Sequence, residues 1–113
     1  MAMKYDVSFR LWFYTGDDKF LGKGRVELLE RIDRTGSISA AAKEMKMSYR
    51  QAWQMVEEMN ERSSHHLVEK QLGGKNGGGT FVTETGHRAI AVFHEMEEKV
   101  RKFIEQESSK LQF

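Results

Sequence analysis

Apolar residues recur at helical spacing in the middle of the chain. Three of them follow one another at intervals of four and three positions: Ala52, Val56 and Met59. This spacing predicts a helix with one buried face. Ser48 precedes the run and Gln51 follows Ser48 by three positions, a pattern typical of a capped helix N-terminus. At 3.6 residues per turn, Arg50 and Gln54 lie on the opposite face, which we expect to be exposed.

A shorter helix is expected just before this one. The run Ala40–Ala42 consists of strong helix formers that are small enough for another helix to approach closely. Ser39 can cap this helix, which we expect to extend from Ala40 to Met45. Gly36 fits the left-handed position that ends a preceding helix. That preceding helix has its own apolar stripe: Val26, Leu28, Leu29 and Ile32.

Two helices joined by a tight turn are the arrangement found in helix-turn-helix DNA-binding proteins. In such proteins the exposed start of the second helix contacts base edges, where Arg pairs with guanine and Gln with adenine. Arg50 and Gln54 occupy suitable positions. A small helical hairpin inside an ordinary core would show the same pattern, so both interpretations stand at this point.

Alternating apolar and polar positions predict strands at two places. From Tyr5 to Tyr14 every second residue is apolar, and a turn and short return strand follow, so we expect a hairpin within residues 5–21. Trp12 and Tyr14 fall on its polar face, where they would cover a helix or a second chain, or stack on a ligand. Residues 67–72 and 80–83 predict a second hairpin.

The tip of the second hairpin is rich in glycine. Five of the ten glycines of the chain lie within residues 73–79, together with Lys75 and Asn76. Small residues allow a backbone to approach a phosphate or a minor groove, and Lys75 adds positive charge. A flexible solvent loop is the alternative. Its position directly after two predicted helices favours a DNA-contacting wing.

The last apolar pattern predicts one long helix from Glu84 to about Ser108. Its apolar residues are spaced 4, 3, 4 and 3, as in the seam of a coiled coil: Ala89, Phe93, Met96, Val100 and Phe103. Such a seam packs against its own domain or against a second chain. We favour the second arrangement and predict these five residues as the dimerisation surface.

Composition changes this picture only modestly. The 113 residues carry a net charge of +1, so any DNA affinity must come from local clustering of cations or from dimerisation. The absence of cysteine excludes disulfides and thiolate metal sites. The four histidines are expected to be solvated surface rather than metal ligands. We find no catalytic arrangement, expect neither an enzyme nor a cofactor, and expect a cytoplasmic protein because no apolar signal segment is present.

Several of these stretches together resemble a known family. The run GSISAAAKEMKMSYRQAWQMVEEMN, followed by LVEK and GGKNGGGTFVTETG, resembles the N-terminal DNA-binding domain of the molybdate-responsive (ModE) transcription regulators. The resemblance covers about Gly24 to Ala91. It implies an α+β, mainly α fold: a LysR-like winged helix-turn-helix over residues 24–83, with an N-terminal β-hairpin and a long C-terminal dimerisation helix at 84–108.

The resemblance also implies a function. Members of that family bind palindromic operators in double-stranded DNA as dimers, and the regulated genes would serve molybdenum or oxyanion transport or related processes. Carried onto this chain, the start of the second helix, the wing tip and three residues near phosphates would contact DNA. These residues are Ser37, Ser39, Lys43, Ser48, Tyr49, Arg50, Gln51, Trp53, Gln54, Lys75 and Asn76.

Two expectations limit this implied function. Members of the family carry a C-terminal molybdate-binding part, whereas this sequence stops at Phe113 after the long helix, so we expect no molybdate site in it. The main alternative function is a winged-helix module that binds another protein through Trp12, Tyr14 and the long helix. A weaker alternative is an oxyanion sensor at a dimer interface.

Overall fold

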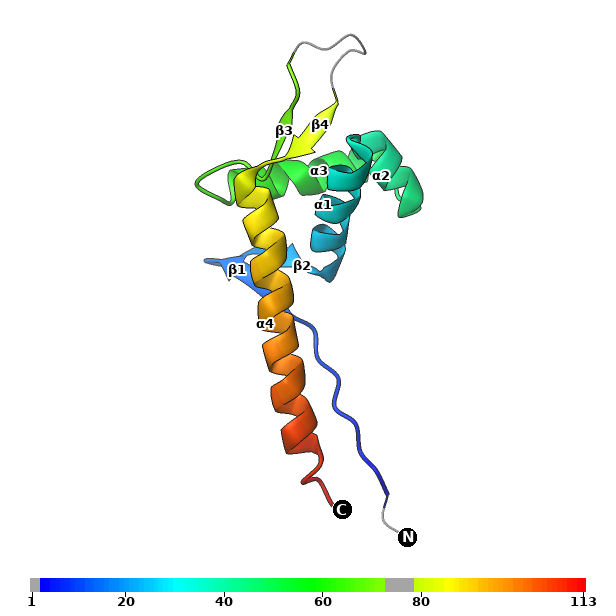
Figure 1. The fold of residues 1–113 in the computed structure, drawn as a ribbon, viewed down its shortest axis with the longest axis vertical. Helices are drawn as coiled ribbons and strands as arrows, with labels where there is room; N and C mark the ends of the chain where they lie inside the picture. Colours follow the sequence, from blue (N-terminus) through cyan, green and yellow to red (C-terminus); the bar gives the residue numbers. More distant parts are fainter. Residues whose placement is uncertain (1–2, 73–78) are drawn as a thin grey trace.

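The computed structural model describes residues 3–72 and 79–113. Three helices pack together (Figure 1). The strands over residues 68–70 and 80–82 stand at one end of these helices, and the long C-terminal helix extends beyond the other, so the molecule is elongated at 65 × 28 × 21 Å. The elements are β1 (Trp12–Thr15), β2 (Asp18–Gly22), α1 (Lys23–Thr35), α2 (Ile38–Glu44), α3 (Tyr49–Glu61), β3 (Val68–Lys70), β4 (Thr80–Val82) and α4 (Glu84–Ser108). This architecture confirms the predicted winged helix-turn-helix.

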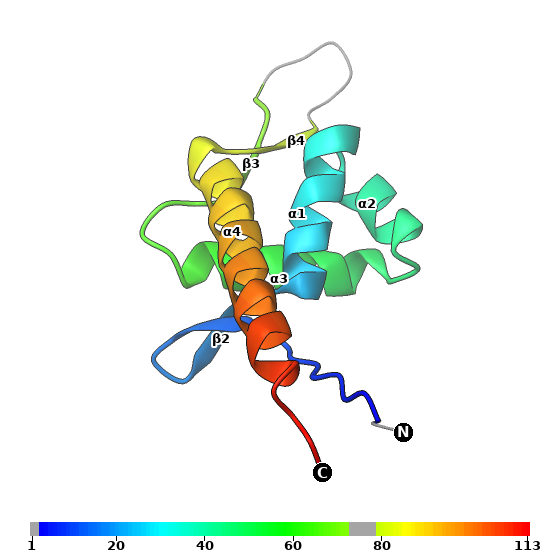
Figure 2. The ribbon, with the colours of Figure 1, turned by 60° about the horizontal axis from the view of Figure 1, so that its bottom comes forward.

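The hydrophobic core forms around α1. Figure 2 shows α1 between α2 and α4, with α3 crossing beneath. The stripes predicted from the sequence of α1 and α3 are all buried, which confirms the phase of both helices. The core residues are Leu21, Val26, Leu28, Leu29, Ile32, Ile38, Ala41, Ala42, Ala52, Val56, Met59, Leu67, Val68, Val82 and Phe93.

The ends of the first helices depend on specific residues. Gly36 has a φ of 71° and its N–H donates to the carbonyl of Ile32 over 2.7 Å, so it ends α1 as predicted. The predicted cap of α2 is wrong. Ser37, not Ser39, accepts the N–H of Ala40 on its hydroxyl at 3.0 Å. α2 starts two residues earlier than predicted, and this start places the side chain of Ile38 in the core. Ser37 and Ser39 can both cap a helix, and the burial of Ile38 favours Ser37.

The first hairpin is shorter than the predicted strand. β1 and β2 pair antiparallel with a bulge between Phe13 and Tyr14, whereas residues 3–11 are outside any strand of the described chain. The ring of Trp12 covers Gly22, where an added Cβ would lie 2.6 Å from the ring. Trp12 therefore packs within its own hairpin, with the ammonium of Lys19 at 4.6 Å from the ring centroid, while Tyr14 is exposed.

The apolar seam of α4 is divided between the core and the surface. Phe93 is 1% exposed and its ring lies 5.3 Å from that of Phe13. Its prediction as a dimerisation residue is corrected, because the side chain is buried within its own chain. Ala89 also packs against this core, and Val100 is half-buried. Met96 and Phe103 are 45% and 63% exposed.

The start of α4 lies very close to β3 and β4. A Cβ on Gly86 would overlap the carbonyl oxygen of Leu67 and would lie 2.5 Å from Cγ1 of Val82. Thr83 caps the same turn, since its hydroxyl accepts the N–H of Gly86 at 3.1 Å. The absence of a side chain at residue 86 therefore sets how closely the long helix packs on the second hairpin.

We expect Gly86→Ala to lower the free energy of unfolding by about 1–3 kcal/mol, because the new methyl group must displace backbone. Gly24→Ala is the matched control: it also lies in the first turn of a helix, but a Cβ there meets nothing within 4 Å. We expect Gly24→Ala to stabilise by about 0.4–1 kcal/mol. Urea denaturation followed by circular dichroism measures both. Equal effects of the two substitutions would contradict the close packing.

Candidate nucleic-acid interface

The turn between α2 and α3 is held by backbone bonds and small residues. The N–H of Met47 donates to the carbonyl of Ala42 at 3.0 Å. Lys46 occupies a left-handed conformation, with a φ of 56°. Ala42 and Ala52 are buried where α2 and α3 meet, and their small side chains allow the two helices to approach closely. The two helices therefore form a compact helix-turn-helix that fixes the direction of α3.

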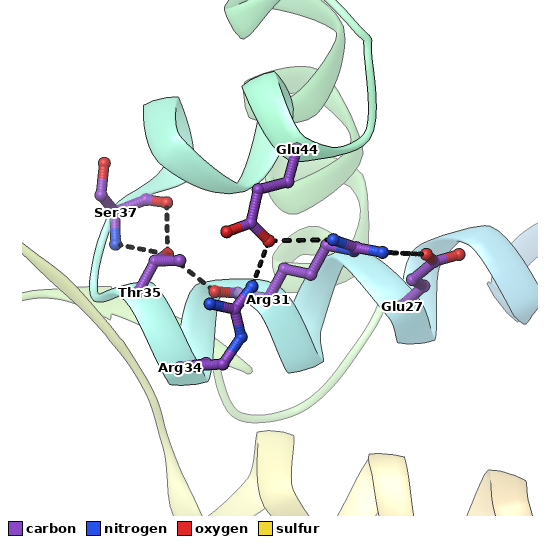
Figure 3. Close-up of polar contacts among 6 residues, drawn as sticks. All are labelled: Glu27, Arg31, Arg34, Thr35, Ser37 and Glu44. Atoms are coloured by element: carbon purple, nitrogen blue, oxygen red, sulfur yellow. Dashed lines mark hydrogen bonds and ion pairs between the residues drawn. The ribbon is translucent and has the colours of Figure 1, made fainter.

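An ionic network fixes α2 on α1 (Figure 3). The guanidinium of Arg31 lies 2.8 Å from the carboxylate of Glu27 and 2.9 Å from that of Glu44, and Arg34 also contacts Glu44. The hydrogen bond from Arg31 is the main cause of a lowered pKa of Glu44. The bond to Glu27 is the main cause of a raised pKa of Arg31. These two arginines are therefore occupied in holding the helices together.

The start of α3 presents the predicted side chains to solvent. Ser48 caps the helix by accepting the N–H of Gln51 at 3.1 Å, as predicted. Tyr49 and Trp53 are 55% and 43% exposed. Arg50 and Gln54 lie on the side opposite the buried stripe, whereas Tyr49 and Trp53 lie between the two faces and are exposed at the start of the helix. These exposed residues are Ser48, Tyr49, Arg50, Gln51, Trp53 and Gln54.

Charge is unevenly distributed along the helix-turn-helix. Lys43, Lys46 and Arg50 are exposed, and no ion pair within residues 3–72 and 79–113 involves them. The second half of α3 carries Glu57 and Glu61, and Glu58, which is paired with Arg25 and Arg62. A phosphate backbone is therefore attracted to the first two turns of α3, where the helix dipole is also positive, and repelled from the last two.

The remaining predicted DNA-binding residues have different environments. Ser39 and Lys43 are exposed on α2. Ser37 is half-buried and its hydroxyl accepts the N–H of Ala40, which leaves the hydroxyl proton to donate; its contact with DNA stays a prediction. Lys75 and Asn76 lie outside the residues that the structure describes.

Asn60 connects α3 to the second hairpin, a role that the sequence analysis did not identify. Its side-chain carbonyl accepts the N–H groups of Leu67 at 2.8 Å and Val68 at 3.3 Å, and its amide donates to the carbonyl of Val68 at 3.0 Å. Val68 begins β3, the first strand of the wing, and Leu67 immediately precedes it. The sequence placed Asn60 at the start of a polar break after the predicted helix, and nothing there indicated this role; in the structure α3 continues to Glu61. The amide therefore sets the position of the wing relative to α3.

Two of the four histidines lie where α4 packs on α1. Nε2 of His87 is 2.8 Å from Asp33, and Nε2 of His94 is 3.2 Å from Glu30, so both connect α4 to α1. Within the described part of the chain, no group of three or more His, Asp or Glu side chains could hold a metal ion. The same part contains no helix with the length and apolarity needed to cross a membrane.

The chain is similar to known regulators. Residues 24–87 match the family described as bacterial regulatory helix-turn-helix protein, lysR family. The DNA-binding transcriptional dual regulator ModE of Escherichia coli (strain K12) is 45% identical over 74 residues, which are 66% of this chain and 28% of that protein. For the molybdenum transport protein ModE of Azotobacter vinelandii the identity is 37% over 91 residues, 80% of this chain and 34% of the relative.

A third relative carries a different name. The molybdenum-pterin-binding protein MopB of Rhodobacter capsulatus is 44% identical over 84 residues, 74% of this chain and 31% of that protein. The chain thus spans about a third or less of the length of these curated relatives. The shared region contains the helix-turn-helix, both strands of the second hairpin and the start of α4.

We expect Asn60→Ala to accelerate amide hydrogen exchange at Leu67 and Val68, because their N–H groups lose their acceptor. The free energy of unfolding should fall by about 1–3 kcal/mol, since the N–H of buried Leu67 is left unpaired. Exchange followed by NMR measures the first effect and urea denaturation the second. Glu61→Ala, one residue further along and exposed, is the control. Unchanged exchange at both amides would show that Asn60 does not hold the wing.

Proposed function

Because this chain belongs to the LysR family of bacterial regulatory helix-turn-helix proteins, we propose that it binds specific sequences of double-stranded DNA and regulates transcription. The observation that carries the proposal is the exposed first half of α3, on which Arg50 and Gln54 share one face. Arg can donate two hydrogen bonds to a guanine edge, and Gln can pair with an adenine edge. An α-helix fits the major groove, so this face can contact base pairs directly.

The surrounding charges favour one mode of docking. The exposed cations Lys43 and Lys46 flank the start of α3, whereas Glu57 and Glu61 follow the base-contacting residues on the same helix. The N-terminal half of α3 would therefore enter the groove while its acidic end points away from the phosphates. Ser39 and Lys43 on α2 would contact the backbone of the DNA and set the register of α3.

A single domain offers few cations for this task. Its net charge is +1, and a few phosphate contacts support only non-specific dissociation constants of about 10⁻⁴ to 10⁻⁶ M. We propose that two copies act together, since linking two binding surfaces makes the second contact nearly intramolecular. A two-fold dimer would bind a palindromic operator with half-sites about one helical turn, or a multiple of one turn, apart.

The exposed part of α4 is the surface that supports a dimer. At 3.6 residues per turn, Val92, Met96 and Phe103 lie within about 40° of one another, and all three are exposed. We name them the outer stripe of α4. Buried Phe93 and half-buried Val100 lie beside this stripe and face the chain's own core. The outer stripe thus replaces the predicted five-residue seam as the proposed dimer surface.

The names of two relatives refer to molybdenum. One is called a molybdenum transport protein and another a molybdenum-pterin-binding protein. We propose that the genes regulated by this chain serve molybdenum or related oxyanion transport, and that it acts in the cytoplasm, where such a regulator meets DNA.

We expect Arg50→Ala to cost about 1–3 kcal/mol of affinity for the specific site and to relax the preference at one base pair. The operator would first be obtained by selection from random DNA, and fluorescence anisotropy would then measure affinity. Lys102→Ala, on the distal part of α4, is the charge-matched control and should bind as wild type. Wild-type affinity of Arg50→Ala would contradict the role of Arg50. Absence of salt-dependent DNA binding by the wild type would instead favour a protein-interaction module.

We expect Met96→Glu to keep the folded circular dichroism spectrum, to sediment as a monomer and to lose tight operator binding, because it places a charge in the outer stripe of both copies. Lys102→Glu places the same carboxylate on α4 away from the outer stripe, with a charge change of two units instead of one, and should remain a dimer. Phe93→Glu should instead unfold the chain, since it buries a carboxylate in the core. A wild type that sediments as a monomer at roughly tens of micromolar would contradict the dimer.

A further inference from the structure

Residues 3–11 have the sequence of a strand but no strand partner in their own chain. Their apolar and polar positions alternate, with Tyr5, Val7, Phe9 and Leu11 at the odd positions. Among the described residues, no backbone hydrogen bond is made by residues 3–10, and none of residues 3–11 belongs to a strand. An alternating segment with unpaired N–H and C=O groups can accept a neighbouring strand.

Aromatic contacts hold this segment at its two ends. At one end Phe13 contacts Phe93 with ring centroids 5.3 Å apart, and at the other Tyr5 meets Phe113 edge-to-face at 5.1 Å. Figure 1 shows the segment running beside the distal half of α4, and Figure 2 shows both chain ends on the same side of the molecule. The odd face is therefore in contact at its two ends, whereas Val7 in its middle is 46% exposed, and the backbone of residues 3–10 makes no backbone hydrogen bond within the described chain.

β1 continues this segment and is itself half-paired. It pairs with β2 on one side, and the sheet contains these two strands alone in the described chain. The sheet packs on the core through Leu21, Phe13 and Phe20, so its stability does not require another strand, but the second edge of β1 carries none among the described residues. The free edge of β1 and the backbone of residues 3–11 thus form one continuous edge that can pair with another strand.

We propose that the partner is the same segment of a second copy, so that residues 4–12 of two chains pair with each other and the two hairpins lie at opposite ends of one continuous sheet. The proposal rests on the dimer proposed above and adds a second contact to it. Pairing across a two-fold axis is antiparallel, and an axis that passes through a residue keeps odd positions opposite odd positions. Both apolar faces then point to the same side of the sheet.

The charges select one register. With the axis at Ser8, Asp6 lies opposite Arg10 of the partner subunit, and symmetry repeats this opposite-charge pair. With the axis at Val7, Lys4 would lie opposite Arg10 of the partner subunit, which places like charges together. With the axis at Phe9, neither Asp6 nor Lys4 lies opposite a charge. Opposite charges across a sheet stabilise it and like charges destabilise it, so the register centred on Ser8 is favoured.

Charge exchange tests this pairing. In Asp6→Arg or in Arg10→Asp, both cross-strand pairs of the dimer become like-charged, and we expect dimerisation measured by sedimentation to weaken about tenfold. An equimolar mixture of the two variants should recover wild-type dimerisation as heterodimers, because every pair is then Arg opposite Asp. Lys4→Glu is the control: it changes nothing if the axis is at Ser8, and it tightens the dimer if the axis is at Val7.

A single cysteine tests the position of the axis. The chain contains no cysteine, so Ser8→Cys introduces one thiol per copy, and opposite Cβ atoms lie about 4.5–5.5 Å apart in an antiparallel pair. Mild oxidation should yield a covalent dimer on a non-reducing gel for Ser8→Cys and not for Lys4→Cys, whose thiols would be far apart. A covalent dimer of Lys4→Cys alone would overturn the register.

The outcomes separate this proposal from the dimer itself. If the strand variants dimerise as wild type, and their mixture shows no preference for heterodimers, the strand pairing is wrong, while a monomeric Met96→Glu would still support the dimer through α4. If the wild type is monomeric, both the dimer and the strand pairing fail, and the effect of Arg50→Ala on DNA binding still tests the proposed function.

Discussion

The left-handed conformation of Gly36 is the constraint on which the helix-turn-helix and the second hairpin depend. It ends α1, and its carbonyl oxygen accepts the N–H of Thr80 at 3.0 Å. The same carbonyl lies so close to Gly79 that a Cβ there would be 2.6 Å away. Ser37, the next residue, caps α2. One peptide unit therefore sets the end of α1, the start of the helix-turn-helix and the base of the wing.

The cations of the chain divide into those that build the fold and those that face solvent. Arg31 and Arg34 hold α2 on α1, and Arg25 contacts Glu58 of α3 at 2.5 Å. Once these are excluded, the positive charge of the helix-turn-helix is concentrated around the first turns of α3. A net charge near zero is thus compatible with a strongly polarised binding surface, because most charges of the fold are paired locally.

Features that depend on neighbouring residues in the sequence could be predicted, and those that depend on distant ones could not. The buried stripe of α3, its cap at Ser48 and the ends of α4 follow from spacing, and the structure confirms them. The burial of Phe93 depends on Phe13, eighty positions away in the sequence. The role of Asn60 depends likewise on a hairpin outside its helix. The alternation from Tyr5 to Tyr14 predicted one strand. The prediction is correct only from Trp12 onward, where β2 supplies a neighbouring strand.

The two tryptophans occupy different parts of the molecule, and each has its own surroundings. Trp53 is exposed at the start of α3, whereas Trp12 lies over Gly22 beneath the ammonium of Lys19. Intrinsic fluorescence therefore contains two separable signals. Emission from Trp53 reports on what approaches the helix-turn-helix, and emission from Trp12 reports on the first hairpin. The two tryptophans are intrinsic fluorophores, so changes at the helix-turn-helix and at the first hairpin can be followed in one sample without a label.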